Sequence, residues 1–96
     1  MKIKWTRKAL NDLKEIYHFI AKENLKAARQ TNAIIRQKAL FLLGNPYIGR
    51  ANDIPNAREL VITGTPYILF YKVEETSDSI FIVHVIHAAR DWPNLV

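Results

Sequence analysis

Apolar residues recur at helical spacing in the first half of the chain. Thr6 precedes the first such stretch and is a typical helix N-cap, because its hydroxyl can accept a hydrogen bond from a first-turn amide. The apolar stripe of this predicted helix consists of Leu10, Leu13, Ile16, Tyr17 and Ile20. Its polar face consists of Lys8, Asn11, Asp12, Lys14, Glu15 and Lys22.

The helical pattern breaks near residues 23–24 and restarts in a second amphipathic stretch. Gly44 is expected to end this second helix in a left-handed conformation, and Asn45-Pro46 prevents its continuation. Because the linker between the stretches is short, the two helices should form an antiparallel hairpin. The stripe of the second helix consists of Ala28, Ile35, Ala39 and Leu42, widened by Ile34, Phe41 and Leu43.

Strand-like runs lie on both sides of the predicted hairpin. Residues 2–5 alternate apolar and lysine side chains, and three further runs cover residues 58–63, 67–73 and 80–87. The connections between the last three runs are brief, so these strands must be antiparallel neighbours. The chain is therefore predicted to be an α+β domain: an N-terminal strand, an antiparallel helical hairpin, a loop over residues 44–57, and a three-stranded antiparallel meander.

The last two predicted strands are apolar on both faces. Ile68 and Phe70 lie between the apolar residues of the other set, and Ile80, Ile82 and Ile86 alternate with Phe81, Val83 and Val85. A sheet that is covered on one side normally carries polar residues on the other. The helices can cover only one side, so either the chain's own tail and loop or a second molecule should cover the other.

Composition indicates one domain over residues 1–96. The chain is 49% apolar and 24% charged, and no run approaches the roughly 20 apolar residues of a membrane span. Its start has no apolar signal-peptide core, and the absence of cysteine excludes disulfides and thiolate sites. The expected location is the cytoplasm, with no membrane partner.

The charge is unevenly distributed along the chain. Residues 1–50 hold eleven Lys or Arg and three acids, whereas residues 51–96 hold three Lys or Arg and six acids. The basic half is suited to a polyanion or an acidic protein, although a solvated helix surface explains the same composition.

Few residues form a pattern that supports catalysis. His84 and His87 differ by an odd step, so they should point to opposite sheet faces and cannot share a metal. His84 is expected to be a core histidine with a satisfied hydrogen bond, and neither a metal nor a cofactor is expected. Arginine and aromatic residues near strand ends suit nucleic-acid contacts or protein hot spots. These candidate binding residues are Arg50, Arg58, Tyr67, His87, Arg90 and Trp92.

Several short motifs occur in an order that resembles the RelE/ParE superfamily of bacterial toxins. They are Trp5-Thr6 with Ala9 and Asp12-Leu13, Glu23-Asn24, Asn45-Pro46, Gly49-Arg50, Arg58-Glu59-Leu60, Pro66-Tyr67 with Leu69 and Tyr71, and His87 with Arg90-Asp91-Trp92-Pro93. The resemblance covers nearly the whole chain. It implies the toxin of a type II toxin–antitoxin system, neutralised in a hetero-oligomer by a ParD- or RelB-like antitoxin.

The superfamily divides by target: RelE-like members cleave mRNA on the ribosome, and ParE-like members poison DNA gyrase without hydrolytic chemistry. When the chain is matched on Tyr67 and Tyr71, the basic pair of the ribonucleases falls at Glu59 and Val61, and their catalytic arginine falls at Ile68. The resemblance therefore favours a ParE-like gyrase inhibitor that is not an enzyme.

Residues 90–96 and Arg58 are the expected target contacts, although for Trp92 and Pro93 the favoured interpretation is that they cap the sheet edge and tie down the tail. The alternative is a ribosome-dependent mRNA endonuclease that uses Arg58, His87 and Arg90 as catalytic residues. A third reading is a toxin fold that has lost toxicity and only pairs with its partner.

Overall fold

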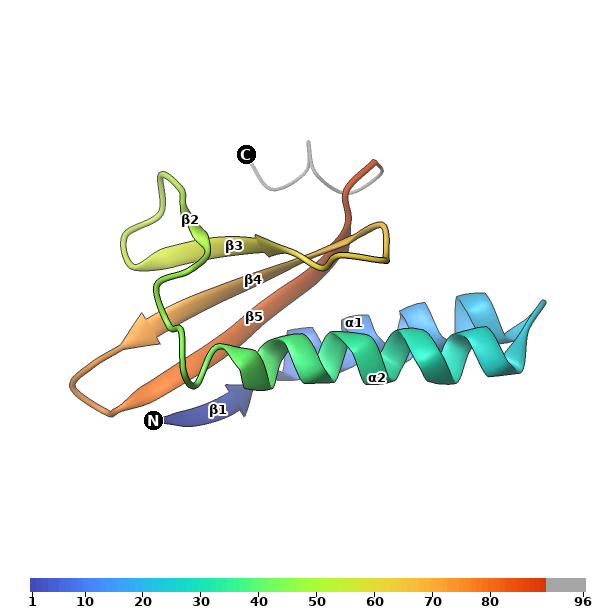
Figure 1. Cartoon of the computed structure of the whole chain (residues 1–96), viewed down its shortest axis with the longest axis horizontal. Helices are drawn as coiled ribbons and strands as arrows, with labels where there is room; N and C mark the ends of the chain where they lie inside the picture. Colours follow the sequence, from blue (N-terminus) through green and yellow to red (C-terminus); the bar gives the residue numbers. More distant parts are fainter. Residues whose placement is uncertain (90–96) are drawn as a thin grey trace.

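The computed structural model describes residues 1–89, which form the α+β fold predicted from the sequence (Figure 1). The elements, in chain order, are β1 (Lys2–Trp5), α1 (Arg7–Ala21), α2 (Leu25–Phe41), β2 (Arg50–Ala51), β3 (Ala57–Val61), β4 (Tyr67–Glu74) and β5 (Ser79–His87). The short strand β2 was not predicted and lies within the segment interpreted as a loop. No helix in the described part of the chain is long and apolar enough to cross a bilayer.

One five-stranded sheet runs in the order β1-β5-β4-β3-β2. The first strand pairs parallel with β5, and the other neighbours are antiparallel. The helices α1 and α2 run side by side along one face and extend past the sheet (Figure 1). Alternate strand residues pack beneath them into one core, which includes Leu13, Ile35, Leu42, Leu69, Tyr71, Ile80 and Ile82.

The sheet face turned away from the helices is called here the outer face. Its residues, taken from the cross-strand pairing, are Lys2, Lys4, Arg50, Ala57, Glu59, Val61, Ile68, Phe70, Lys72, Glu74, Ser79, Phe81, His84 and Ile86. An irregularity opposite Phe70 and Tyr71 inserts Val83 as an extra residue in β5. Val85 therefore joins the core and Ile86 moves to the outer face, which is the reverse of the strict alternation predicted from the sequence.

Both helix N-caps are formed by side chains. Thr6 Oγ1 accepts a hydrogen bond from Ala9 N at 3.1 Å, as predicted, and Asn24 Oδ1 accepts from Ala27 N at 3.0 Å. The C-terminus of α2 differs from the prediction, because Gly44 does not adopt a positive φ. Successive i→i+3 hydrogen bonds through residues 39–45 end the helix instead.

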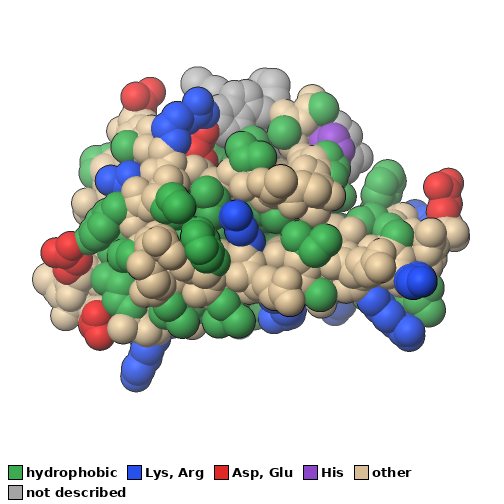
Figure 2. All heavy atoms as spheres, in the orientation of Figure 1, with side chains coloured by type: hydrophobic (Ala, Val, Ile, Leu, Met, Phe, Trp, Pro, Cys, Tyr) green, Lys and Arg blue, Asp and Glu red, His purple; other side chains and the backbone are tan. Residues whose placement is uncertain are grey.

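Burial along the helices departs from the predicted stripes at several positions. Ala28, Ile35, Ala39 and Leu42 are buried as expected, but Leu10, Phe41 and Leu43 are exposed. Phe41 and Leu43 belong to a group of exposed apolar residues at the end of α2 and in the following loop. In Figure 2, which has the orientation of Figure 1, hydrophobic side chains are visible on the side where the end of α2 and the following loop face the viewer.

Asp12 was predicted on the polar face of α1 but is only 5% exposed. The reason is the sheet topology: β1 pairs with β5 only as far as Ile82, and α1 covers the edge of β5 beyond that point. There Asp12 Oδ2 accepts from Val85 N at 3.0 Å and from His84 Nδ1, while Lys8 Nζ donates to Oδ1 at 2.8 Å. The hydrogen bond expected for His84 is therefore confirmed, and its partner is this buried carboxylate. The expected core position is wrong, because His84 is half-buried on the outer face.

Candidate target-binding surface

The residues predicted to contact a target fall at two ends of the sheet. Arg58 lies opposite Tyr71 at the start of β3, whereas Tyr67 lies opposite His87 at the far end of β4. Tyr67 and Tyr71 are four positions apart on β4, which corresponds to about 13 Å along the strand. The structure thus brings Tyr67 and His87 together but separates both from Arg58. Arg90 and Trp92 lie outside the described residues.

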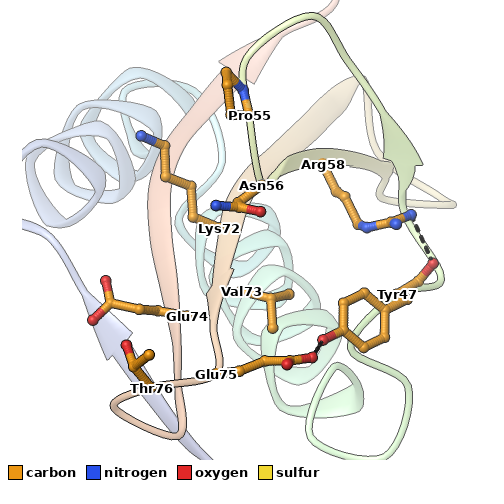
Figure 3. Close-up of a pocket in the computed structure, with 9 residues that line it drawn as sticks. All are labelled: Tyr47, Pro55, Asn56, Arg58, Lys72, Val73, Glu74, Glu75 and Thr76. Carbon is orange, nitrogen blue, oxygen red and sulfur yellow. Dashed lines mark hydrogen bonds between the residues drawn. The ribbon is translucent and has the colours of Figure 1, made fainter.

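Arg58 is turned toward the loop that precedes β2. Its Nη1 donates to the carbonyl of Tyr47 at 3.0 Å and to the carbonyl of Gly49 at 2.7 Å. The guanidinium also lies 5.2 Å from the centre of the Tyr47 ring, where a cation–π attraction is favourable. Figure 3 shows Arg58 and Tyr47 side by side on the loop side of the strand. Arg58 therefore holds this loop against β3.

The loop and β4 enclose a cleft of 570 Å³. Tyr47 Oη donates to the carboxylate of Glu75, and this hydrogen bond raises the pKa of the Tyr47 hydroxyl. Lys72 and Val73 point to opposite sides of β4 where it borders the cleft (Figure 3). The remaining lining residues are Pro55, Asn56, Arg58, Glu74 and Thr76. Among the described residues, no His, Asp or Glu cluster is suited to a metal ion.

Gly49 makes a close backbone contact that the sequence analysis did not identify. Its N–H donates to Tyr71 Oη at 2.8 Å, and a Cβ at this position would lie 2.6 Å from the same oxygen. Burial raises the pKa of Tyr71, whereas the Gly49 N–H and the nearby charge of Arg58 oppose this rise. The tyrosine hydroxyl thus fixes the start of β2, and this explains the Gly49-Arg50 motif and its distance from Tyr71.

On the outer face, Arg50 and Glu59 form an ion pair across β2 and β3. Glu59 is buried, and Arg50 covers it from the solvent side. Next to this pair, Val61 is 64% exposed and lies opposite Ile68. Together with Leu60, these residues line a pocket of 320 Å³. The positions matched to the cations of RelE-like ribonucleases, residues 59, 61 and 68, thus meet in one pocket and supply no positive charge.

At the other end of the sheet, Tyr67 is buried and packs edge-on against His87, with ring centres 5.5 Å apart. His87 is half-buried, and its Nδ1 accepts from Ala89 N at 3.2 Å. Tyr67 therefore contributes mainly to packing, and His87 covers its ring at this end of the sheet.

The chain matches known proteins over nearly its whole length. Residues 3–92 match the family model described as the ParE toxin of the type II toxin–antitoxin system parDE. The chain belongs to the ParE toxin family. A relative in Sinorhizobium fredii, described as "Putative toxin Y4kP", is 36% identical over 95 residues, which are 99% of this chain and 96% of the relative.

The fold of this ParE-family toxin is also similar to the folds of solved toxin structures. A chain of the chromosomal ParDE system from P. aeruginosa superposes with a TM-score of 0.78 at 28% identity, over 91% of the toxin and 95% of that chain. The isolated E. coli RelE toxin shares the fold alone, with a TM-score of 0.64 at 16% identity over 98% and 97% of the two chains. The toxin therefore has the RelE/ParE fold and is the toxin component of a type II toxin–antitoxin system.

Proposed function

We propose that this toxin binds DNA gyrase, stabilises its cleaved-DNA state, and acts without hydrolytic chemistry of its own. The observation that carries the proposal is the pocket of Arg50, Glu59, Leu60, Val61 and Ile68. A buried acid and two aliphatic side chains occupy the positions that match the ribonuclease cations. The arginine of this pocket is paired with that acid.

Cleavage of RNA by its 2′-hydroxyl requires a base, an acid and cations that stabilise the developing charge on phosphorus. Arg58, a candidate for this role, uses Nη1 to bind two loop carbonyls. His87, the second candidate, lies at the other end of β4. The geometry of the described residues therefore gives more support to a binding function than to the ribonuclease alternative.

A ParD-like antitoxin is the proposed partner in the cytoplasm. One solved relative is part of a ParDE system, and another solved structure is described as the intact E. coli RelBE toxin–antitoxin complex. On this toxin, Val61 is exposed and Ile68 is half-buried on the outer face, so apolar surface remains for a partner to cover. Arg50, Arg58, His87, Arg90 and Trp92 are the proposed polar and aromatic contacts.

A supercoiling assay with purified toxin and gyrase tests the proposal. We expect loss of supercoiling and accumulation of gyrase-linked cleaved DNA, both suppressed by prior incubation with the antitoxin encoded beside the gene. Unaffected gyrase at a stoichiometric excess of folded toxin would overturn the proposal. In a parallel arm with ribosomes and mRNA, codon-phased cuts detected by primer extension would instead support the endonuclease alternative.

A further inference from the structure

A row of three side chains crosses the outer face at β1, β5 and β4. The cross-strand pairing places Lys4 beside Phe81 and Phe81 beside Lys72. Lys4 Nζ lies 5.7 Å from the centre of the Phe81 ring. Both lysines are exposed and the phenyl ring is half-buried. Lys4 Nζ therefore lies over the aromatic ring, and Lys72 lies beside the ring on the neighbouring strand.

The next row continues this arrangement. His84 lies opposite Phe70, and their rings are 6.5 Å apart at an angle of 65°. The buried carboxylate of Asp12 binds Nδ1 of His84 and thereby fixes the orientation of the imidazole. Two adjacent rows thus place aromatic rings at the centre of the sheet, and the Asp12–His84 hydrogen bond orients one of them.

Charge on this part of the outer face favours an anion. The pairing brings no carboxylate into the row of Lys4, Phe81 and Lys72, because Ala57 is the next residue across. The row of His84 and Phe70 continues across the sheet to Glu59, and Arg50 neutralises the charge of Glu59. Glu74 lies on the outer face in the next row, which also contains Ser79 and the cation Lys2. Glu75 is engaged by Tyr47. Positive charge around an aromatic ring matches a phosphate backbone that carries exposed bases.

We propose that this row binds single-stranded nucleic acid: Lys4 Nζ moves from the Phe81 ring to a phosphate, a base stacks on the ring in its place, and Lys72 holds a neighbouring phosphate. Because β1 and β4 lie on either side of β5, the two lysine backbones are about 10 Å apart, a span that their flexible side chains adjust to successive phosphates. A duplex fits poorly, since its bases are already stacked and cannot lie on the ring. This binding is separate from the action on gyrase, and it involves residues other than those matched to ribonuclease cations.

Fluorescence anisotropy of the full-length toxin with a labelled oligonucleotide of about 12 residues tests the proposal without gyrase. DNA and RNA strands of one sequence, the matching duplex, and a poly-glutamate competitor form the arms. We expect either single strand to bind more tightly than the duplex. The ratio between DNA and RNA then identifies which strand the row prefers.

Variants locate the binding on the outer face. The double change Lys4→Gln and Lys72→Gln should weaken binding about tenfold at low salt and lower the log–log salt slope by about 1.4, the value for two lost phosphate contacts. The change Phe81→Leu should weaken binding about fivefold or more, whereas Phe81→Trp should retain it and show fluorescence quenching on stacking. As a matched control, Lys22→Gln with Lys26→Gln removes two exposed charges from the helical hairpin and should leave the affinity within about twofold.

Several results would overturn this inference. The first is equal affinity for the duplex and the single strands, and the second is an equal loss of affinity in the Lys22→Gln, Lys26→Gln control. The third is complete displacement of the oligonucleotide by poly-glutamate of equal total charge. The fourth is no binding to either strand by toxin whose circular-dichroism spectrum is native. Because gyrase is absent, none of them bears on the supercoiling assay.

Discussion

The outer face of the sheet has two halves that differ in charge and in how they are held. On β2 and β3, Arg50 neutralises the buried Glu59 beside the aliphatic Val61. On β1, β5 and β4, Lys4 and Lys72 flank Phe81, and no carboxylate lies in their row. The half that contains residues 59, 61 and 68, the positions that the sequence resemblance matched to ribonuclease cations, is therefore neutral. The basic and aromatic residues lie on the other half, which is called here the basic half.

This difference shows that one sheet face carries two kinds of surface. The strand order and helix packing are those of the RelE/ParE fold, and the outward-facing residues set the charge of each half. Each half is also anchored by its own buried group: Asp12 for the basic half and Tyr71 for the neutral half. The predictions below separate these anchors.

The largest effect is expected from Asp12→Ala, which removes the anchor of the basic half. The substitution leaves Val85 N and His84 Nδ1 without their acceptor, and we expect a loss of about 3 kcal/mol in the free energy of unfolding. Urea denaturation measures it. The exposed acid Glu15 on the same helix is the control, and Glu15→Ala should change stability by less than about 0.5 kcal/mol. Equal effects of the two substitutions would show that Asp12 is not an anchor.

On the neutral half, Gly49→Ala should cost about 2 kcal/mol. The new methyl group would meet Tyr71 Oη and the carbonyl of Glu59, which lies 2.9 Å from the Cβ position. Gly44→Ala is a matched control, because no atom lies within 4 Å of its Cβ position. Thermal unfolding of both variants tests this prediction, which fails if Gly49→Ala is as stable as Gly44→Ala.

The sequence predicted the fold well because periodicity and short connections determine it. The stripe of Ala28, Ile35, Ala39 and Leu42 identified α2, and the brief connections implied the antiparallel meander. The exceptions have tertiary causes. Asp12 is buried because α1 closes the edge of β5. Strand β2 forms because Gly49 meets Tyr71, a contact between residues 22 positions apart.

The candidate site was less predictable than the fold. Arg50 and Arg58 were identified by residue type, but sequence spacing did not reveal that Arg58 binds loop carbonyls or that Arg50 neutralises Glu59. Tyr67 was selected as an aromatic near a strand end and is buried. The row of Lys4, Phe81 and Lys72 joins three strands, and strand order was needed to find it.

A smaller effect is expected from breaking the ion pair of the neutral half. Arg50→Ala leaves the buried Glu59 carboxylate without its partner and should cost about 1–2 kcal/mol. Glu59→Gln alone should cost less, because the exposed arginine regains water. A double-mutant cycle by urea denaturation should give a coupling energy of about 1 kcal/mol, and a coupling of zero would remove this pair as the stabilising interaction of the pocket.

The smallest effect concerns alkaline pH. Burial raises the pKa of Tyr71 in the folded state, so its contribution to stability is complete below the unfolded value of 10.0 and is lost as the pH rises above it. Tyr71→Phe should lower stability at neutral pH by about 1 kcal/mol through loss of the Gly49 hydrogen bond. The same variant should show a shallower decline of stability above pH 10 than the wild type. Parallel slopes in urea titrations at neutral and alkaline pH would contradict this.

The central proposal is that the toxin acts on gyrase and leaves RNA intact, and it rests on the absence of cations at positions 59, 61 and 68. The most direct test is to induce the toxin in cells without its antitoxin and to map, in the same culture, both the 5′ ends of mRNA and the sites of gyrase-linked DNA breaks. The account predicts new gyrase-linked breaks with a DNA-damage response and no codon-phased mRNA ends. Codon-phased mRNA ends with no gyrase-linked breaks would contradict it.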